Sequence, residues 1–311
     1  MNQFEQVEAF LVSRFDTGIT GLEFLARGDW SVAYAFQSAG RDYVARFGDF
    51  HEDFAKDRLA GAFTSESLPI PQVVDLGEAF GGYHAISERV KGTLLDTLNG
   101  MEMRQVLPSL FAALDAARVA DLSGSTGFGL WHADGNAPTP NWRSWLLTVA
   151  EDSPTRRTYG WRARLAASPT GEKPFAEALR VMTLLLPTCP EQRHLVHCDL
   201  LHNNVLVSGE RITGVFDWGC SLYGDFLYDV AWLSFCSLWF PAWQDIDFPQ
   251  EAQRHYTAIG LTVPDFTERL RCYELHIGLG AQSYNAYKER WEEVALIAQR
   301  TLALARAPLT A

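Results

Sequence analysis

The first part of the chain shows two spacings of apolar residues, one typical of a helix and then one typical of strands. Residues 2–15 repeat apolar side chains at helical spacing, which predicts a helix. Residues 22–26, 31–37 and 41–47 are short, rich in β-branched and aromatic side chains, and separated by glycine-containing turns. These three segments predict consecutive antiparallel strands.

The pattern then changes from strands to helices. A charged segment over residues 52–63 predicts a helix that ends before an L-P-I-P sequence, and residues 72–76 and 83–90 predict two further strands. Later predicted helices cover residues 101–120, 142–150 and 174–186 and several stretches after residue 226. We therefore predict an α+β fold with a small antiparallel sheet in residues 1–90 and a larger, mainly helical part in residues 91–311.

Composition and charge restrict the kinds of partner. The 311 residues are 47% hydrophobic and 21% charged, as in an ordinary globular protein. A formal net charge of −12 argues against a nucleic-acid-binding surface and favours cationic ligands. The five cysteines form no C-x-x-C pair, so neither a zinc site nor a disulfide framework is indicated.

Nothing in the sequence indicates membrane insertion. The N-terminus lacks the basic flank and apolar core of a signal peptide. The most apolar stretch, residues 230–243, is shorter than the about 20 residues that a membrane-spanning helix needs. We expect a cytoplasmic monomer that binds neither membranes nor nucleic acid.

The strongest chemical signal is H-C-D-L-L-H-N-N at residues 197–204. It has the spacing H-x-D-x-x-x-x-N, which is typical of a kinase catalytic loop. In such a loop a carboxylate accepts the proton of the attacking hydroxyl, and an amide oxygen five positions later holds magnesium. We predict that Asp199 is the catalytic residue and that Asn204 is a Mg²⁺ ligand.

A second carboxylate follows at the end of another predicted strand. Asp217 comes directly after the strand-like residues 212–216 and is followed by Trp218 and Gly219. Kinases place a magnesium-binding aspartate at this point, as in D-F-G. An isolated Asp-Trp-Gly would be read as a turn, but its distance from Asn204 favours a second Mg²⁺ ligand.

A cation lies on the third predicted strand. Kinases use a lysine there to bind the α- and β-phosphates of the nucleotide, and this chain has Arg46. Asp57, on the following helix, is the candidate to orient Arg46, with Glu52 and Asp53 as further candidates. These three acidic residues could equally form a solvated helix face.

The turn between the first two strands is a candidate phosphate-binding loop. G-D-W-S at residues 28–31 has one glycine where a kinase loop usually has three. Ser31 could donate hydrogen bonds to a phosphate from its hydroxyl and amide groups, and a plain hairpin turn is the alternative.

These motifs together resemble the aminoglycoside phosphotransferases, and within them the hygromycin B phosphotransferases of the 4-O-kinase type. The resemblance extends over nearly the whole chain. It includes Y-V-A-R at 43–46, K-D-R at 56–58, L-P-I-P at 68–71, A-D-L-S at 120–123, G-F-G at 127–129, R-H-L-V-H-C-D at 193–199, N-N-V-L at 203–206, R-I-T at 211–213, R-L-R at 269–271 and I-G-L at 277–279.

The resemblance implies a protein-kinase-like fold of two lobes and transfer of phosphate from ATP or GTP, with Mg²⁺, to a hydroxyl of a cationic aminoglycoside, which gives antibiotic resistance. Arg46 matches an arginine of the hygromycin group. Backbone groups at Glu88 and Val90 would bind adenine, and Asn203 and Trp239 would contact the antibiotic.

Two departures from the family pattern concern the acceptor. Leu200, Leu201 and His202 replace small residues of the catalytic loop, and Cys220 replaces an acidic residue. We expect these positions to lie beside the acceptor. Two alternatives therefore stay open: a kinase of another small hydroxyl or amine, of the homoserine, fructosamine or macrolide type, and a non-catalytic nucleotide-binding protein of the same fold.

Overall fold

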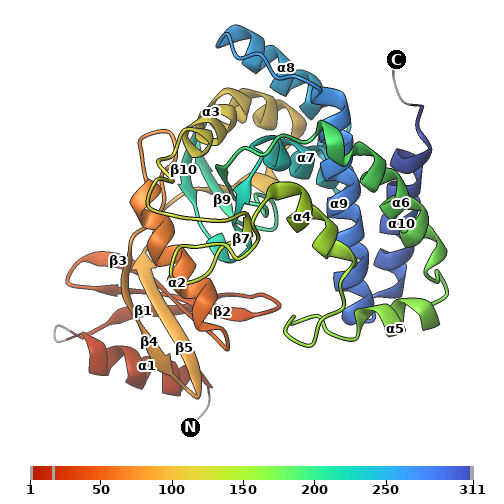
Figure 1. The fold of residues 1–311 in the computed structure, drawn as a ribbon. Coiled ribbons are helices and arrows are strands. Elements are labelled where there is room, and N and C mark those ends of the chain that lie inside the picture. The colour runs from red at the N-terminus through yellow and green to blue at the C-terminus, as the bar shows by residue number, and fades with distance from the viewer. Residues whose placement is uncertain (1–2, 16–17, 309–311) are drawn as a thin grey trace.

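A five-stranded antiparallel sheet forms the N-terminal end of the protein (Figure 1). The computed structural model describes residues 3–15 and 18–308; Asn2, the first residue of the predicted N-terminal helix, lies outside them. The strands are β1 (Thr20–Arg27), β2 (Ser31–Ser38), β3 (Arg41–Gly48), β4 (Val73–Ala79) and β5 (Gly82–Glu88). Their order in the sheet is β1-β2-β3-β5-β4, so β3 lies at the centre.

One helix covers each side of this sheet. Helix α1 (Gln3–Arg14) buries Val7 and Leu11 against inward side chains of β2, β3 and β5, among them Phe36 and Phe47. Helix α2 (His51–Ala60), continued by the 3₁₀ turn η1 (Gly61–Phe63), contacts β4 and β5 and also the segment after Asp217. The alternation of buried and exposed residues along β3 therefore places Arg46 on the side opposite Ala45.

The chain then passes from the sheet to the helical lobe. Strand β6 (Thr93–Leu94) pairs with β9 (Val205–Ser208), which pairs with β10 (Arg211–Val215). A Cβ atom at Gly92 would lie 2.8 Å from the carbonyl oxygen of Val207, so only glycine allows this close crossing. A third sheet joins β7 (Gly129–Leu130), β11 (Leu222–Gly224) and β8 (His194–Val196).

Helices make up the rest of the larger lobe (Figure 1). They are α3 (Gly100–Arg118), α4 (Trp142–Leu147), α5 (Trp161–Ala167), α6 (Lys173–Leu185), α7 (Leu227–Cys236), α8 (Phe248–Ala258), α9 (Phe266–Tyr287) and α10 (Trp291–Arg306), with 3₁₀ turns η2 (Leu95–Thr97), η3 (Thr148–Ala150), η4 (Leu186–Thr188), η5 (Trp218–Cys220), η6 (Ser237–Trp239) and η7 (Pro241–Trp243). Helix α9 is the central element, packed against α5, α6, α7 and α10. No helix within residues 3–15 and 18–308 combines the length and apolar character needed to cross a bilayer.

The predicted fold class is confirmed: an antiparallel sheet precedes a mainly helical lobe. Every predicted strand of the first lobe is present within a few residues of its expected ends. The predicted helix over residues 52–63 is divided into α2 and η1, and that over 142–150 into α4 and η3, because the last turn of each tightens to 3₁₀ geometry.

Candidate active site

A buried carboxylate fixes the start of the predicted catalytic loop. Both oxygens of Asp229, in the first turn of α7, accept hydrogen bonds from the backbone: Oδ2 from the N–H of His197 at 2.9 Å and Oδ1 from that of Cys198 at 2.8 Å. Burial raises the pKa of Asp229 despite these donors. Asp229 therefore holds the loop from below.

His197 connects the predicted catalytic loop to the segment of Asp217. Its Nδ1 accepts a hydrogen bond from the N–H of Asp199 at 3.2 Å, so its Nε2 is the donor to the carbonyl oxygen of Phe216, 3.0 Å away. The imidazole also lies edge-on to the indole of Trp218, with ring centroids 4.6 Å apart. One buried side chain thus sets the spacing of two predicted site segments.

Asp199 and Asn204 are joined directly. The amide nitrogen of Asn204 donates to the carbonyl oxygen of Asp199 at 2.8 Å, which leaves the amide oxygen available as a ligand. Asn204 is buried, whereas the Asp199 side chain is 24% exposed and can reach a small molecule.

Arg46, Asp57 and Asp217 form a second group. Arg46 makes an ion pair with Asp57, and its other terminal nitrogen lies 3.5 Å from Oδ1 of Asp217. Oδ1 of Asp57 accepts a hydrogen bond from the N–H of Trp218 at 2.7 Å. Asp217 has a left-handed backbone with φ 61°, and its side chain is 44% exposed. Strand β3 and helix α2 together therefore hold Asp217 in place.

Of the three acidic residues on α2 that were candidates to orient Arg46, Asp57 is the one that pairs with it. Glu52 instead pairs with His132, and Asp53 pairs with Arg157 through two contacts of 2.8 Å. Both of these carboxylates bind residues of the larger lobe, so α2 connects the lobes as well as orienting Arg46.

Lys56 supports the site, a role that the sequence did not predict although the residue lies in the K-D-R match at 56–58. It is buried, and its ammonium donates to the carbonyl oxygens of Gly219 at 2.8 Å and Ser221 at 3.0 Å. It also lies 4.8 Å from the ring centre of Trp131. Burial lowers the pKa of Lys56 to about 8. In sequence a lysine on a charged helix is read as solvated, so only its partners reveal its role.

The turn between β1 and β2 contacts the far end of α9. Asp29 accepts hydrogen bonds from Tyr284 and Arg290, and Trp30 contacts the ring of Phe50 and the ammonium of Lys288. Ser31 begins β2, and its carbonyl oxygen accepts the N–H of Gly28 at 2.9 Å. The predicted phosphate-binding loop is thus a tight turn whose tip is held by the other lobe.

The segment between the lobes runs across β9 and β10. The N–H of Arg89 donates to the carbonyl oxygen of Asp42 at 2.9 Å, and the hydroxyl of Thr213 donates to that of Lys91 at 3.1 Å. Glu88 ends β5 opposite Tyr43, and the side chain of Val90 packs beside Gly214. Glu88 and Val90 therefore flank the start of the connection between the lobes.

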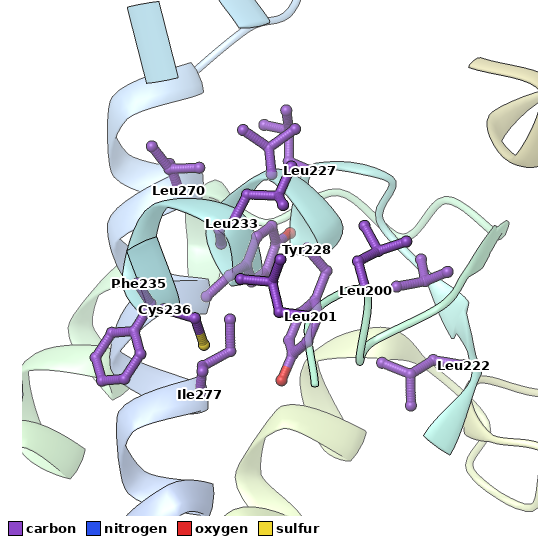
Figure 2. Packing of buried hydrophobic residues seen from close by; sticks show 14 of the residues in the cluster. Leu200, Leu201, Leu222, Leu227, Tyr228, Leu233, Phe235, Cys236, Leu270 and Ile277 are labelled. Carbon is purple, nitrogen blue, oxygen red and sulfur yellow. The ribbon is translucent and has the colours of Figure 1, made fainter. Parts of the chain in front are cut away.

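Two residues that were expected beside the acceptor, Leu200 and Leu201, lie in the core instead. Leu200 and Leu201 are buried, and Figure 2 shows them packed with residues of α7 such as Leu227, Tyr228 and Leu233. The expectation that both leucines lie beside the acceptor is wrong, because their apolar side chains anchor the loop in the core.

His202 and Cys220 are exposed, unlike the two leucines. Nδ1 of His202 lies 2.7 Å from Oδ1 of Asp199, and this hydrogen bond raises the pKa of the histidine. The N–H of Asn203 donates to Asp96 at 2.9 Å. Trp239 lies in η6 with its ring 5.6 Å from that of Phe235 and is 42% exposed.

The hydrogen bonds and ion pairs thus bring together Arg46, Asp57 and Asp217 on one side and Asp199 and Asn204 on the other, with His197 between them. Within the described part of the chain, no hydrogen bond links Ser31, Glu88 or Trp239 to these residues. In residues 3–15 and 18–308 no three His, Cys, Asp or Glu side chains gather as a complete metal site. A metal here would need oxygen ligands from a bound phosphate in addition to Asn204 and Asp217.

Comparisons with known proteins agree with this geometry. The family described as the phosphotransferase enzyme family matches residues 23–268. The hygromycin-B 4-O-kinase of Escherichia coli is 36% identical over 275 residues, which cover 88% of this chain and 76% of that protein. The crystal structure of aminoglycoside phosphotransferase APH(4)-Ia is 33% identical with a TM-score of 0.86, covering 98% of this chain and 99% of the other.

Two further solved structures extend the comparison. A thermostable mutant of the same phosphotransferase, in a ternary complex with AMP-PNP and hygromycin B, is 32% identical with a TM-score of 0.85 and covers 97% of this chain and 98% of its own. The GDP complex of aminoglycoside 2'-phosphotransferase-IIIa is 14% identical with a TM-score of 0.67 and covers 98% of this chain and 99% of its own. The last likeness is one of fold.

Proposed function

We propose that this chain, which belongs to the phosphotransferase enzyme family, transfers the terminal phosphoryl group of ATP to a hydroxyl of an aminoglycoside and so confers resistance to it. The carrying observation is the arrangement of Asp199, Asn204 and Asp217, joined through His197 and faced by the guanidinium of Arg46. Hygromycin B is the proposed acceptor, because the 36%-identical relative is a hygromycin-B 4-O-kinase.

The nucleotide lies between the lobes in this proposal. Arg46, oriented by Asp57, binds the α- and β-phosphates, and backbone groups near Glu88 and Val90 bind adenine. Ser31 lies in the turn above the phosphates. Relatives crystallised with AMP-PNP and with ADP support an adenine nucleotide as donor, and GTP is the alternative to be tested. We place the boundary between the lobes after Val90, within the crossing that ends at Gly92.

The donor set suits magnesium. The amide oxygen of Asn204 and the carboxylate of Asp217 are hard oxygen ligands, and Mg²⁺ is commonly held by one or two such groups plus substrate phosphates. When bound there, Mg²⁺ would neutralise charge on the phosphates. Asn204 keeps its oxygen free because its nitrogen is bound to the backbone of Asp199, 2.8 Å away.

Asp199 orients the acceptor hydroxyl toward the γ-phosphorus. As the new oxygen–phosphorus bond forms, the bond from the γ-phosphorus to the bridging oxygen breaks, ADP leaves, and the hydroxyl proton passes to the Asp199 carboxylate. Positioning and charge neutralisation supply most of the rate enhancement in this type of reaction. The acceptor's ammonium groups are attracted by a chain of net charge −12. Asn203 and Trp239 are proposed to contact the sugar rings.

Mass spectrometry of products tests the reaction. The enzyme is incubated with Mg-ATP or Mg-GTP and, separately, hygromycin B, other aminoglycosides, homoserine, a fructosamine and a macrolide. We expect hygromycin B to gain one phosphate, and NMR of the product locates it. If only homoserine, the fructosamine or the macrolide were phosphorylated, the aminoglycoside assignment would be rejected. If no compound were phosphorylated although the protein binds ATP, a non-catalytic binding protein would be favoured.

A matched pair of variants tests the role of Asp199. Asp199→Asn removes the base with little change in shape, and we expect turnover to fall by about 100-fold or more with nucleotide binding retained. Glu172→Gln makes the same chemical change at an exposed position beside α6 and should leave turnover unchanged. Near-normal turnover in Asp199→Asn would contradict the proposed mechanism.

A further inference from the structure

A histidine of the catalytic loop is bonded to the catalytic carboxylate. Nδ1 of His202 lies 2.7 Å from Oδ1 of Asp199. An ionised carboxylate only accepts hydrogen bonds, so Nδ1 carries the proton and donates it. The donor role holds for the Nδ1–H neutral form and for the imidazolium alike. One oxygen of Asp199 is therefore engaged and the other is left for the acceptor hydroxyl.

The backbone around this histidine holds its ring in place. His202 and Asn203 both have left-handed conformations, with φ of 71° and 68°, which are uncommon for residues other than glycine, although histidine and asparagine adopt them more readily than most side chains. Asp96 accepts the N–H of Asn203 at 2.9 Å. The preceding leucines, Leu200 and Leu201, are buried in the core (Figure 2).

Aromatic packing adds a second constraint on the ring. The imidazole of His202 lies edge-on to the indole of Trp232 on α7, with an interplanar angle of 82°. The His202 side chain is nevertheless 62% exposed, so a small molecule can reach the imidazole and the Asp199 oxygen to which it is bonded. Its exposure, its bond to the side chain of Asp199 and its left-handed backbone together distinguish it from the buried His197, which bonds to the backbone N–H of Asp199.

We propose that His202 is a positioning residue for phosphoryl transfer: it holds Oδ1 of Asp199 and so directs Oδ2 toward the acceptor hydroxyl. This inference rests on the proposed function, because it assigns Asp199 as the group that the acceptor contacts. His202 acts through Asp199, and it binds neither the nucleotide nor the phosphates.

Three substitutions at position 202 separate the effect of the hydrogen bond from that of the left-handed backbone conformation. His202→Asn places an amide N–H where Nδ1 lies and tolerates a left-handed conformation. His202→Leu removes the donor, and His202→Gly removes it while relieving backbone strain. We expect kcat with hygromycin B to fall about 10-fold or more in the leucine and glycine variants, since small displacements of a reacting group are costly. The asparagine variant should retain most of kcat.

Two further kinetic readouts distinguish positioning from other roles. KM for ATP should stay within about 2-fold in all three variants, because the imidazole touches no nucleotide-binding group. In an Asp199→Asn background, His202→Leu should lower the residual rate by less than about 2-fold, because the two residues act as one unit. The proposal would be overturned if His202→Leu lowered the rate in the Asp199→Asn background as much as it does in the wild type, or if His202→Asn and His202→Leu lowered kcat equally.

A measurement without turnover keeps the two proposals separate. In ¹⁵N-histidine-labelled protein, long-range correlations between ring protons and nitrogens report which nitrogen is protonated, and His202→Asn identifies the signal. We expect a protonated Nδ1 in the wild type and a shift toward the Nε2–H form in Asp199→Ala. An unprotonated Nδ1 in the wild type overturns the inference, whereas failure of the wild type to phosphorylate any aminoglycoside overturns only the proposed function.

Discussion

The guanidinium of Arg290 lies 2.8 Å from the carboxylate of Asp29, although 261 residues separate them in the sequence. Tyr284 donates its hydroxyl to the same carboxylate, and the ammonium of Lys288 lies 4.3 Å from the ring centre of Trp30. The turn proposed to lie over the nucleotide phosphates is therefore held by residues at the end of α9 and just after it, and the two lobes contact each other here as well as along the connection after β5.

Removal of Arg290 should weaken nucleotide binding more than it weakens the fold. In Arg290→Ala we expect the Kd for AMP-PNP, measured by calorimetry, to rise about 3- to 10-fold, because the turn loses a constraint that keeps it over the phosphates. Exposed ion pairs contribute about 1 kcal/mol or less to stability, so the melting temperature should change little.

Arg254→Ala is the matched control for that variant. Arg254 makes a similar exposed pair with Glu251 on α8, at 2.7 Å, in a helix that does not belong to the proposed nucleotide site. Its removal should leave the Kd unchanged. Equal affinities in the two variants would show that the contact between Arg290 and Asp29 does not act on the nucleotide.

The sequence predicted those parts of the molecule that depend on local pattern. Alternating apolar residues identify the strands, the spacing of Asp199 and Asn204 identifies the candidate catalytic loop, and Asp217 follows it at the end of the next hairpin. The pairing of Arg46 with Asp57 was also among the predicted options, because a kinase-like strand order places α2 beside β3.

Contacts between distant segments could not be predicted in this way. Lys56 reads as a surface residue until Gly219 and Ser221 are seen to enclose it, and nothing near Asp29 in sequence indicates Arg290. The direction of Leu200 and Leu201 was wrongly inferred because their helical neighbour α7 lies about 30 residues further along the chain. In each case the partner is supplied by the tertiary fold.

Asp57 should contribute separately to nucleotide binding and to stability. Asp57→Asn keeps an oxygen to accept the N–H of Trp218 but loses the charge that pairs with Arg46. Asp57→Ala loses both, and leaves a buried N–H without a partner. We expect both variants to bind ATP more weakly, and the alanine variant to be less stable than the asparagine variant by about 1–3 kcal/mol in urea denaturation. Equal stability of the two variants would contradict the role given to the Trp218 bond.

Lys56 should give stability an unusual pH dependence. Its pKa is lowered by burial from 10.5 to about 8, so between these values the unfolded chain holds the proton that the folded chain has lost. Stability rises with pH wherever the unfolded state binds more protons. The free energy of unfolding of the wild type, relative to Lys56→Met, should therefore be constant below about pH 8 and rise by up to about 3 kcal/mol toward pH 10.5.

Denaturation curves at pH 7, 8, 9 and 10 measure this difference. Lys173→Met, which removes an exposed lysine from the start of α6, should unfold in parallel with the wild type over the same range. A constant difference between the wild type and Lys56→Met across the range would show that Lys56 keeps its ordinary affinity for the proton in the folded state.

Metal dependence provides the sharpest test of the two oxygen ligands. Chelation of Mg²⁺ should abolish turnover, and Asp217→Asn should raise the Mg²⁺ concentration for half-maximal rate by about 10-fold or more, because a charged ligand becomes neutral. The same substitution removes the negative charge of Asp217 but leaves Arg46 paired with Asp57. Because the nucleotide phosphates then face one negative charge fewer, AMP-PNP binding measured without Mg²⁺ should be maintained or improved. Glu172→Gln should change neither quantity. If Asp217→Asn instead lowered metal-free nucleotide binding and left the Mg²⁺ requirement unaltered, Asp217 would act by orienting Arg46, and the magnesium site would have to lie elsewhere.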